Sequence, residues 1–385
     1  MSLKEPKFTI GIEEEYHLVD LTSRDLVPEP PATLLSACQA ALAGQVSPEF
    51  LQSQIEVGTR VCSSLQDARA ELAHLRTTVA DVARSHGLAP IAASTHPFAR
   101  WSRLQHTDKA RYHDLARDLQ GVARRMVVSG MHVHVGIEND DLRIDLMNQA
   151  RYFLPHLLAL STSSPFWEGE NTGLKSFRLA IFGEVPRTGL PGRFSGWSEY
   201  TRTIDVLVKA GVIEDATKIW WDLRPSARFP TLEMRITDVC PRLDDGIAIA
   251  ALFICICRML YRLRRTNLSW RLYPVFLLEE NRWRAQRYGL SDRMFDFGKG
   301  ELVPAGALID ELLMLVAEDA DALGCTREVA HVRTIVARGT SADRQVACHD
   351  AAVAAGMNPQ QALEAVVDQL VSETRDVASP GPGGP

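Results

Sequence analysis

Four short segments of this 385-residue chain alternate apolar residues with charged, amide or imidazole side chains at a period of two. They begin at residues 11, 51, 130 and 231 and read GIEEEYH, LQSQIEVGT, GMHVHV and TLEMRIT. Because successive side chains of a strand point to opposite faces, each segment presents one apolar face and one polar face. A solvated sheet face would explain any one of these strands. Four in one chain favour a single concavity lined by the polar faces.

The polar faces carry a chemically selective set of side chains. Taken in chain order, these are Glu13, Glu15, Gln52, Gln54, Glu56, His132, His134, Glu233 and Arg235. Glutamates at this density repel one another and need cations nearby. Several carboxylates with one imidazole suit Mg²⁺ or Mn²⁺, whereas zinc would recruit more histidine or thiolate. For the histidine pair alone, alternation leaves core packing, metal binding and catalysis open.

Magnesium sites of this kind commonly share their coordination with substrate phosphates. The sequence contains neither a Walker A motif nor a GxGxxG loop, so a cradle of backbone amides is not indicated. Any phosphates would be held by metal ions and by arginines, which bind phosphate oxygens through two parallel hydrogen bonds.

The remaining periodicity predicts an α+β fold with a mostly antiparallel sheet. No linker divides the chain, so we expect one domain over residues 1–372 and a flexible tail over 373–385. A Gly-, Pro- and aromatic-rich stretch over 161–197 is too long for a mere connector. Strands are expected at 7–20, 91–95, 130–137 and 231–239, and helices at 64–87, 108–128, 141–160, 244–268 and over most of the remainder.

Composition is that of a soluble globular protein, with 46% hydrophobic and 23% charged residues. A net charge of −6 gives no long-range attraction to nucleic acid or an anionic membrane. The seven cysteines show no CxxC spacing, and the N-terminus has no apolar signal region. The apolar run at 247–257 is too short to span a bilayer and predicts a buried helix. We therefore expect a cytoplasmic protein.

Five motifs resemble, in order, those of the carboxylate–amine ligases of the type 2 glutamate–cysteine ligase family. They read GIEEEYHLVD, QIEVGTRVC, GMHVHVGI, SSPFWEGENTG with SFR, and RPSARFPTLEMRITD. The similarity covers nearly the whole chain, from about residue 8 to 370. GMHVH and the E-x-R of 233–235 are more distantly similar to glutamine synthetase. The resemblance implies a curved antiparallel sheet with helices outside and the active site on the concave face.

The resemblance also implies a reaction, in which ATP phosphorylates a carboxylate and an amine attacks the resulting acyl phosphate. Matched by motif position, Glu15 and Glu56 would hold one magnesium ion. Glu13, His132 and Glu233 would hold a second. The family further implies a homodimer that acts on small molecules, an amino-acid carboxylate and an amine.

The phosphate and substrate contacts carried over from the family are mostly arginines. His134 would lie against the ATP phosphates, and Arg235 would stabilise the transferring phosphoryl group. The assisting arginine would be Arg224 or Arg228, and the ligand of the substrate carboxylate would be Arg178 or, as a weaker candidate, Arg187.

Two rival functions fit the same residues. A metal-dependent hydrolase also uses clustered acids and histidines, because they can activate water. A non-catalytic nucleotide- or amino-acid-binding protein could use the same scaffold. Substrate pockets are built from loops that vary without disturbing a metal site, so the motifs do not fix the carboxylate or the amine.

Overall fold

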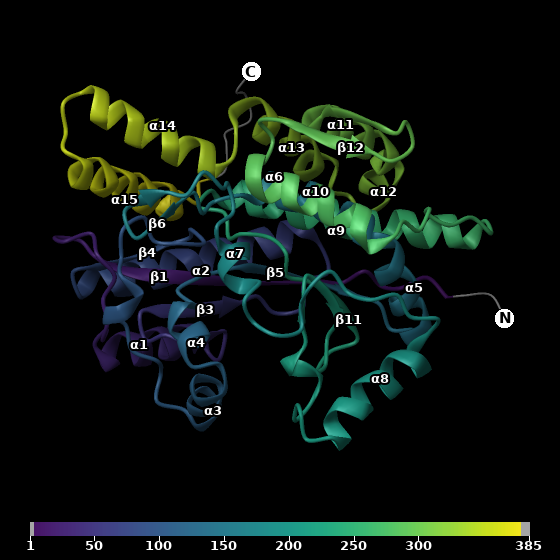
Figure 1. Cartoon of the computed structure of the whole chain (residues 1–385), viewed down its shortest axis with the longest axis horizontal. Helices are drawn as coiled ribbons and strands as arrows, with labels where there is room; N and C mark the ends of the chain where they lie inside the picture. Colours follow the sequence, from purple (N-terminus) through teal and green to yellow (C-terminus); the bar gives the residue numbers. More distant parts are fainter. Residues whose placement is uncertain (1–3, 379–385) are drawn as a thin grey trace.

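The computed structural model of the protein describes residues 4–378. Its centre is a seven-stranded antiparallel sheet in the order β10-β11-β5-β1-β3-β2, with β4 also paired to β1 (Figure 1). The long central strand β1 has β3 on one edge and β5 on the other. The strands of this sheet are β1 (Ile10–Asp20), β2 (Val46–Pro48), β3 (Gln54–Gly58), β4 (Leu88–Ile91), β5 (Met131–Gly136), β10 (Leu223–Pro225) and β11 (Thr231–Met234).

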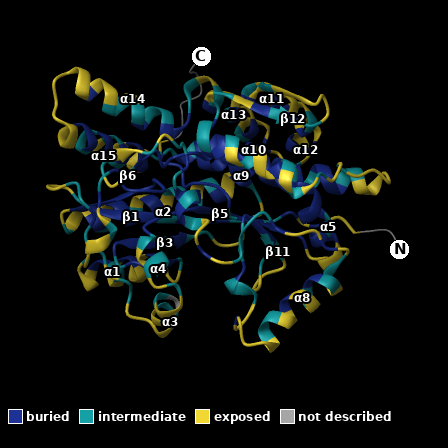
Figure 2. Cartoon of the chain, in the orientation of Figure 1, coloured by how far each residue is buried: buried dark blue, intermediate teal, exposed yellow. Residues whose placement is uncertain are grey.

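Two long helices, α2 (Leu65–Ser85) and α9 (Leu243–Arg265), pack on the apolar face of the sheet. The side chains of Ile12 and Val133 on this face are fully buried, and Figure 2 shows the buried residues concentrated along β1, β5 and α9. Helix α9 is long and apolar enough to cross a membrane by length and composition, but 83% of its most apolar 18-residue stretch is buried inside the protein. It is the core helix that the sequence predicts.

The other elements lie around this core. In the view of Figure 1, α10, α11 and α13 lie above the strands, whereas α3 and α8 lie below them. The remaining helices are α1 (Ala32–Leu42), α3 (Ala110–Leu119), α4 (Gly121–Arg125), α5 (Asp140–Ala150), α6 (Leu154–Ser161), α7 (Arg178–Phe182), α8 (Trp197–Lys209), α10 (Val275–Tyr288), α11 (Ala305–Leu315), α12 (Ala317–Ala322), α13 (Thr326–Arg338), α14 (Ser341–Ala354) and α15 (Pro359–Arg375). Short 3₁₀ turns occur at η1 (Trp101–Arg103), η2 (Arg151–Phe153) and η3 (Ala216–Lys218), and small strands at β6 (Phe166–Trp167), β7 (Glu170–Asn171), β8 (Thr188–Gly189), β9 (Trp220–Trp221), β12 (Arg293–Asp296) and β13 (Glu301–Pro304).

The predicted α+β fold with an antiparallel sheet is confirmed, but several predicted boundaries were wrong. The strand expected at 91–95 is β4, which ends at Ile91. The next residues are buried and bond to side chains instead, as when the amide of Ala92 donates to Thr374. The helix expected at 141–160 is interrupted by a 3₁₀ turn, and α6 restarts with Pro155 in its first turn. Proline suits that position because it lacks an amide donor.

Three further elements differ from expectation. The helix expected at 108–128 breaks at Gln120, whose φ is 47°. The strand expected at 231–239 ends at Met234. The largely helical remainder contains the β12–β13 hairpin, and α15 continues to Arg375, into the predicted tail. The last seven residues of that tail, 379–385, lie outside the described residues. The single domain over 1–372 stays a prediction.

Candidate active site

The register of the central sheet brings the predicted polar residues together. Across β1 and β5, Glu13 lies opposite His132. Across β1 and β3, Glu15 lies opposite Glu56. Side chains opposite each other on one face of an antiparallel pair are only about 5 Å apart at Cβ. The alternation seen in the sequence therefore becomes a contiguous patch of acids and imidazoles.

This patch forms the floor of a cavity of about 440 Å³. Gln54 lines it together with the predicted residues, and Tyr112 and Phe182 contribute to its walls. Of the predicted site residues, all but one line this cavity: Glu13, Glu15, Glu56, His132, His134, Arg178, Arg224, Arg228, Glu233 and Arg235. The structure does not bring Arg187 to the cavity; its guanidinium donates to the carbonyl of Lys218 and lies over the ring of Trp220.

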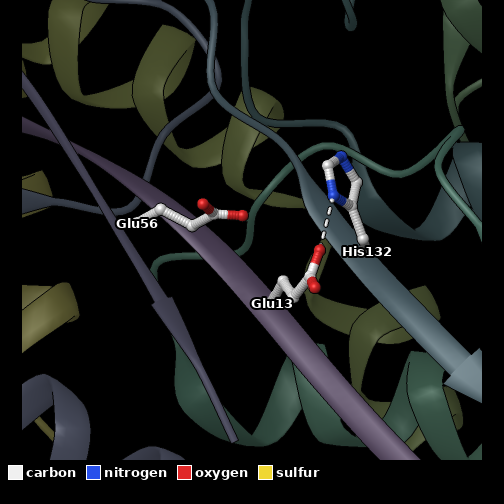
Figure 3. A group of neighbouring side chains, drawn as sticks. All are labelled: Glu13, Glu56 and His132. Carbon is white, nitrogen blue, oxygen red and sulfur yellow. Dashed lines mark hydrogen bonds and ion pairs between the residues drawn. The ribbon is translucent and has the colours of Figure 1, made fainter. Parts of the chain in front are cut away.

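Two overlapping groups of side chains have the spacing of a divalent-metal site. In the first, ligand atoms of Glu13, Glu56 and His132 all lie within 4.8 Å of one another. Figure 3 shows the Glu13 carboxylate pointing at His132, with Glu56 approaching from the neighbouring strand. In the second group, Glu15 and Glu56 meet Glu49 at the same spacing. Both groups offer mainly carboxylate oxygen, which suits Mg²⁺ or Mn²⁺.

The sequence reasoning missed Glu49. It follows β2 directly, and β2 pairs with β3 so that Ser47 lies opposite Glu56. Two residues beyond Ser47, the Glu49 side chain emerges on the same face of the sheet. The signal in the sequence was the run VSPEFLQSQIEV at 46–57, which contains a short partner strand ahead of the recognised one.

The ionisation of the site fits a bound cation. Burial, together with the three neighbouring glutamates of the two groups, raises the pKa of Glu56 well above its ordinary value. Burial also acts to raise the pKa of Glu13, but hydrogen bonds and charge from His132 and His134 outweigh it and lower that pKa. For His132, burial and the charge of Arg235 lower the pKa. A neutral imidazole among repelling carboxylates is the state in which histidine binds a metal.

Glu233 does not join either metal group. Its two carboxylate oxygens accept from Arg224 at 2.9 and 3.0 Å, and one accepts from Arg235 at 2.5 Å. Burial acts to raise the pKa of Glu233, but the charges of these two arginines lower it. Glu56 rather than Glu233 therefore lies at metal-site spacing from Glu13 and His132, while two guanidinium groups contact the Glu233 oxygens, and the triad of Glu13, His132 and Glu233 stays a prediction.

The arginines of the cavity differ in how many of their donors are used. Arg224 uses all three guanidinium nitrogens as donors. Its Nε and Nη2 donate to Glu233, and its Nη1 donates to backbone carbonyls including that of Ile219. Arg235 is half-buried, and its Nε has no hydrogen-bond partner. Arg228 is exposed at the rim of the cavity. His134 contacts Thr231 through Nδ1, and its buried Nε2 lies 3.5 Å from Oε1 of Glu13.

Arg178 comes from α7, within the long 161–197 stretch, and is only 2% exposed. Its Nη2 donates to the carbonyl of Arg235 at 3.1 Å, whereas its Nε has no partner. Burial lowers the pKa of Arg178, and the nearby charges of Asp238 and Glu15 oppose that effect. A buried guanidinium that donates only to carbonyl groups is a ready site for a carboxylate.

Comparison with known proteins places this site in a family. The sequence profile of glutamate–cysteine ligase family 2 matches residues 9–369. A Rhodospirillum rubrum protein with the name "Putative glutamate--cysteine ligase 2" is 59% identical, and the match covers 99% of this chain and all of that protein. A protein of the same name from Jannaschia sp. is 56% identical, and the match covers 95% of this chain and 96% of that protein.

Solved structures agree at the level of the fold. A glutamate–cysteine ligase from Francisella tularensis, crystallised with AMP, has a TM-score of 0.68 at 13% identity, and the match covers 98% of this chain and 90% of that one. A bifunctional glutathione synthetase from Pasteurella multocida also has a TM-score of 0.68, at 17% identity; the match covers 95% of this chain and 52% of that one. With the profile match across nearly the whole chain, these likenesses confirm the resemblance: the chain belongs to glutamate–cysteine ligase family 2, whose members are ligases that form a carbon–nitrogen bond.

Proposed function

We propose that the protein is an ATP-dependent carboxylate–amine ligase that works through an acyl phosphate. A carboxylate oxygen of the first substrate attacks the γ-phosphorus of ATP, and ADP leaves. The amine nitrogen then attacks the acyl carbon, and phosphate leaves with one oxygen of the original carboxylate. The amine gives up a proton, and the product is an amide.

The observation that supports this proposal most strongly is the arrangement of charge in one cavity. Glutamate groups with metal-site spacing and the guanidinium groups of Arg178, Arg224 and Arg235 line the same cavity. The reaction must bring an anionic carboxylate against an anionic triphosphate, and only fixed positive charge overcomes that repulsion. A hydrolase also uses cations to activate water, but it does not have to bring two anionic substrates together.

We assign the divalent ions, Mg²⁺ or Mn²⁺, to the two groups that the structure assembles. Glu15, Glu49 and Glu56 would hold one ion, and Glu13, Glu56 and His132 another. When bound, such ions neutralise phosphate charge and polarise the phosphorus–oxygen bonds. The shared Glu56 would keep the two ions adjacent, and His132 is neutral and therefore able to donate a lone pair.

The phosphate contacts would come from the neighbouring strand. Glu233 fixes the guanidinium groups of Arg224 and Arg235 against each other. Arg235 retains an unpartnered Nε for the transferring phosphoryl group, and the Nε2 of His134, which lies 3.5 Å from Oε1 of Glu13, would contact a phosphate oxygen. On this assignment Glu233 orients arginines and is not a metal ligand.

Arg178 would bind a carboxylate of the amino-acid substrate. Its guanidinium borders the cavity next to Glu15, and its unpartnered Nε supplies a donor that water does not reach. Buried charge-assisted hydrogen bonds of this kind are the strong ones, and they set the orientation of the substrate.

The proposal is tested by measuring ADP release with Mg²⁺ across pairs of amino acids and amines, starting with glutamate and cysteine because the relatives carry those names. We expect ADP only when ATP, a carboxylate and an amine are all present, and no ADP in excess EDTA. Phosphate release that needs no amine would show the rival hydrolase. Nucleotide binding without turnover for any pair would show a non-catalytic binding protein.

We also propose that the protein works as a cytoplasmic homodimer on small molecules, with no nucleic-acid or membrane partner. The support is the family for the dimer, and a net charge of −6 for the absence of polyanionic partners. Light scattering of the purified protein should give twice the 42.7 kDa chain mass. A monomer mass at all concentrations would contradict the dimer.

A further inference from the structure

Gly130, the residue before β5, lies directly beneath the Arg178 guanidinium. A Cβ built on Gly130 would lie 2.4 Å from Nη2 of Arg178, 3.0 Å from its Cζ and 3.1 Å from its Nε. These three atoms span most of the guanidinium plane. The plane therefore occupies the space that any side chain at this position would take.

Backbone conformation does not explain a glycine here. The φ of Gly130 is not in the left-handed region that favours glycine, unlike that of Gly173, whose φ is 74°. Alanine would fit the backbone of Gly130 without strain. Position 130 requires glycine because the Arg178 guanidinium fills the space that a side chain would take.

Other contacts also hold the Arg178 guanidinium in place. Its Nη1 and Nη2 donate to the carbonyls of Ile236 and Arg235, just beyond β11. The ring of Phe182 lies 5.4 Å from its Cζ. With the carbonyls as partners and Gly130 beneath it, the guanidinium has one defined position.

Gly130 also bonds directly to a glutamate of the proposed metal site. Its amide donates to Oε2 of Glu15 at 2.7 Å, and its carbonyl accepts from the Glu15 amide at 3.1 Å. One residue thus contacts both the anion-binding arginine and a carboxylate of the proposed metal site. On the proposed assignment, it would set how far a substrate carboxylate on Arg178 lies from an ion at Glu15.

We propose that Gly130 is a positioning residue for substrate binding: because it has no side chain, the Arg178 guanidinium can lie against the strand beside Glu15. The proposal rests on the proposed function, because it takes Arg178 as the ligand of the substrate carboxylate. It adds that any side chain at position 130 displaces that ligand while the metal and nucleotide contacts remain.

The kinetic test compares Gly130→Ala with Gly136→Ala, using L-glutamate as the carboxylate. Gly136 lies at the other end of β5, and its added Cβ would meet a different flexible atom, Oγ1 of Thr9, at 2.3 Å. We expect Gly130→Ala to raise the KM for glutamate on the order of tenfold, because small misplacements of a binding group are costly. The KM for ATP should change far less, and Gly136→Ala should leave the glutamate KM unaltered. An unchanged glutamate KM in Gly130→Ala would overturn the proposal.

A second measurement does not depend on activity. Gly130→Ala should lower Tm in the wild-type background but not in Arg178→Ala, because removal of the guanidinium leaves room for the new Cβ. A crystal structure of Gly130→Ala should show Arg178 moved from the Ile236 and Arg235 carbonyls. Equal Tm losses in both backgrounds, or an unmoved Arg178, would contradict the claim that Gly130 positions Arg178. If the wild type forms no ADP with any pair, the proposed function fails, but these two measurements still test whether Gly130 positions Arg178.

Discussion

Arg235 forms an ion pair in the structure and is also the residue for which we propose a catalytic role. One terminal nitrogen bonds Glu233 at 2.5 Å, and the Nε is left without a partner. If that free edge contacts the phosphoryl group, charge developing in the transition state is stabilised by a cation that is already fixed in place. If the ion pair is the only role, a lysine should replace the arginine.

Arg235→Lys separates these possibilities. Lysine keeps the charge but loses the planar fork that bonds two oxygens at once. We expect kcat to fall on the order of a hundredfold, with the KM for ATP changed far less. Steady-state kinetics with saturating carboxylate and amine measure both constants. A lysine variant with near-normal kcat would restrict Arg235 to its ion pair with Glu233.

Glu49→Gln tests the candidate metal ligand that the structure adds to the predicted ones. Glutamine keeps the volume but removes one of the charges gathered around Glu56, so the site should hold a divalent ion less tightly. The Mg²⁺ concentration for half-maximal ADP formation should rise on the order of tenfold, since outer and inner metal partners commonly contribute that much. Glu29→Gln, an exposed glutamate outside the cavity, serves as the control. Identical Mg²⁺ curves for both variants would remove Glu49 from the site.

Between elements, one buried ion pair joins the sheet to its covering helix. Arg76 of α2 forms two hydrogen bonds to Glu14 of β1, at 2.7 and 2.8 Å, and also donates to the carbonyls of Cys240 and Pro241. Both charged side chains are at most 1% exposed. Arg76→Ala would leave a buried carboxylate without its cation, which should lower the free energy of unfolding by about 3–5 kcal/mol.

Urea unfolding measures that loss, and Arg84→Ala on the exposed side of the same helix is the matched control. Arg84 lies in the last turn, so its removal should cost less than about 1 kcal/mol through the helix dipole. A loss for Arg76→Ala no larger than that of the control would mean that solvent reaches Glu14, contrary to the packing of α2 on β1.

Strand alternation predicted much of this architecture because it follows from backbone geometry alone. The faces of β1 and β5 were read correctly, since period two assigns each side chain to one side. The ends of the strands and helices were predicted less well. The strand expected at 91–95 lies earlier, because which residues pair with β1 is decided by partners distant in sequence. The hairpin of β12 and β13 was missed for the same reason.

The candidate site shows the same division. The cavity residues on recognisable strands were predicted, whereas Glu49 was not, because it follows a strand of only three residues. Glu233 was placed on the correct face, but its contact with Arg224 was not predicted, because that contact depends on the pairing of β10 with β11. Sequence alternation gives the face of a side chain, and tertiary contacts decide its partner.

For the whole molecule, two buried histidines predict how stability depends on pH. Burial lowers the pKa of His96 and of His156 to about 4, from an ordinary 6.5. At His96 the neutral ring is specifically favoured, because Nδ1 accepts from the Ala99 amide while Nε2 contacts the Arg24 carbonyl. Below pH 6.5 the unfolded chain therefore binds protons that the folded chain does not.

The free energy of unfolding should then fall as the pH drops from about 6.5 toward 4, by about 1.4 kcal/mol per pH unit for each ring. Urea unfolding at pH 7.5, 6.0 and 5.0 follows the effect above the ordinary range of carboxylates. The raised pKa of Glu56 acts in the opposite direction, but it does so in the wild type and in His156→Gln alike, so the comparison isolates the histidine. His156→Gln should reduce the slope by about one proton, and an unchanged slope would show that this ring is protonated in the folded protein.

The central claim is that the cavity activates a carboxylate by phosphorylating it, and the fate of one oxygen atom tests this most directly. The measurement uses ¹⁸O-labelled carboxylate, ATP, Mg²⁺ and an active amine, followed by mass spectrometry of the released phosphate. Because phosphate leaves the acyl carbon with one original carboxylate oxygen, the account predicts one ¹⁸O atom in each phosphate formed. Unlabelled phosphate, with its new oxygen drawn from water, would contradict the acyl phosphate and make the protein an ATP hydrolase.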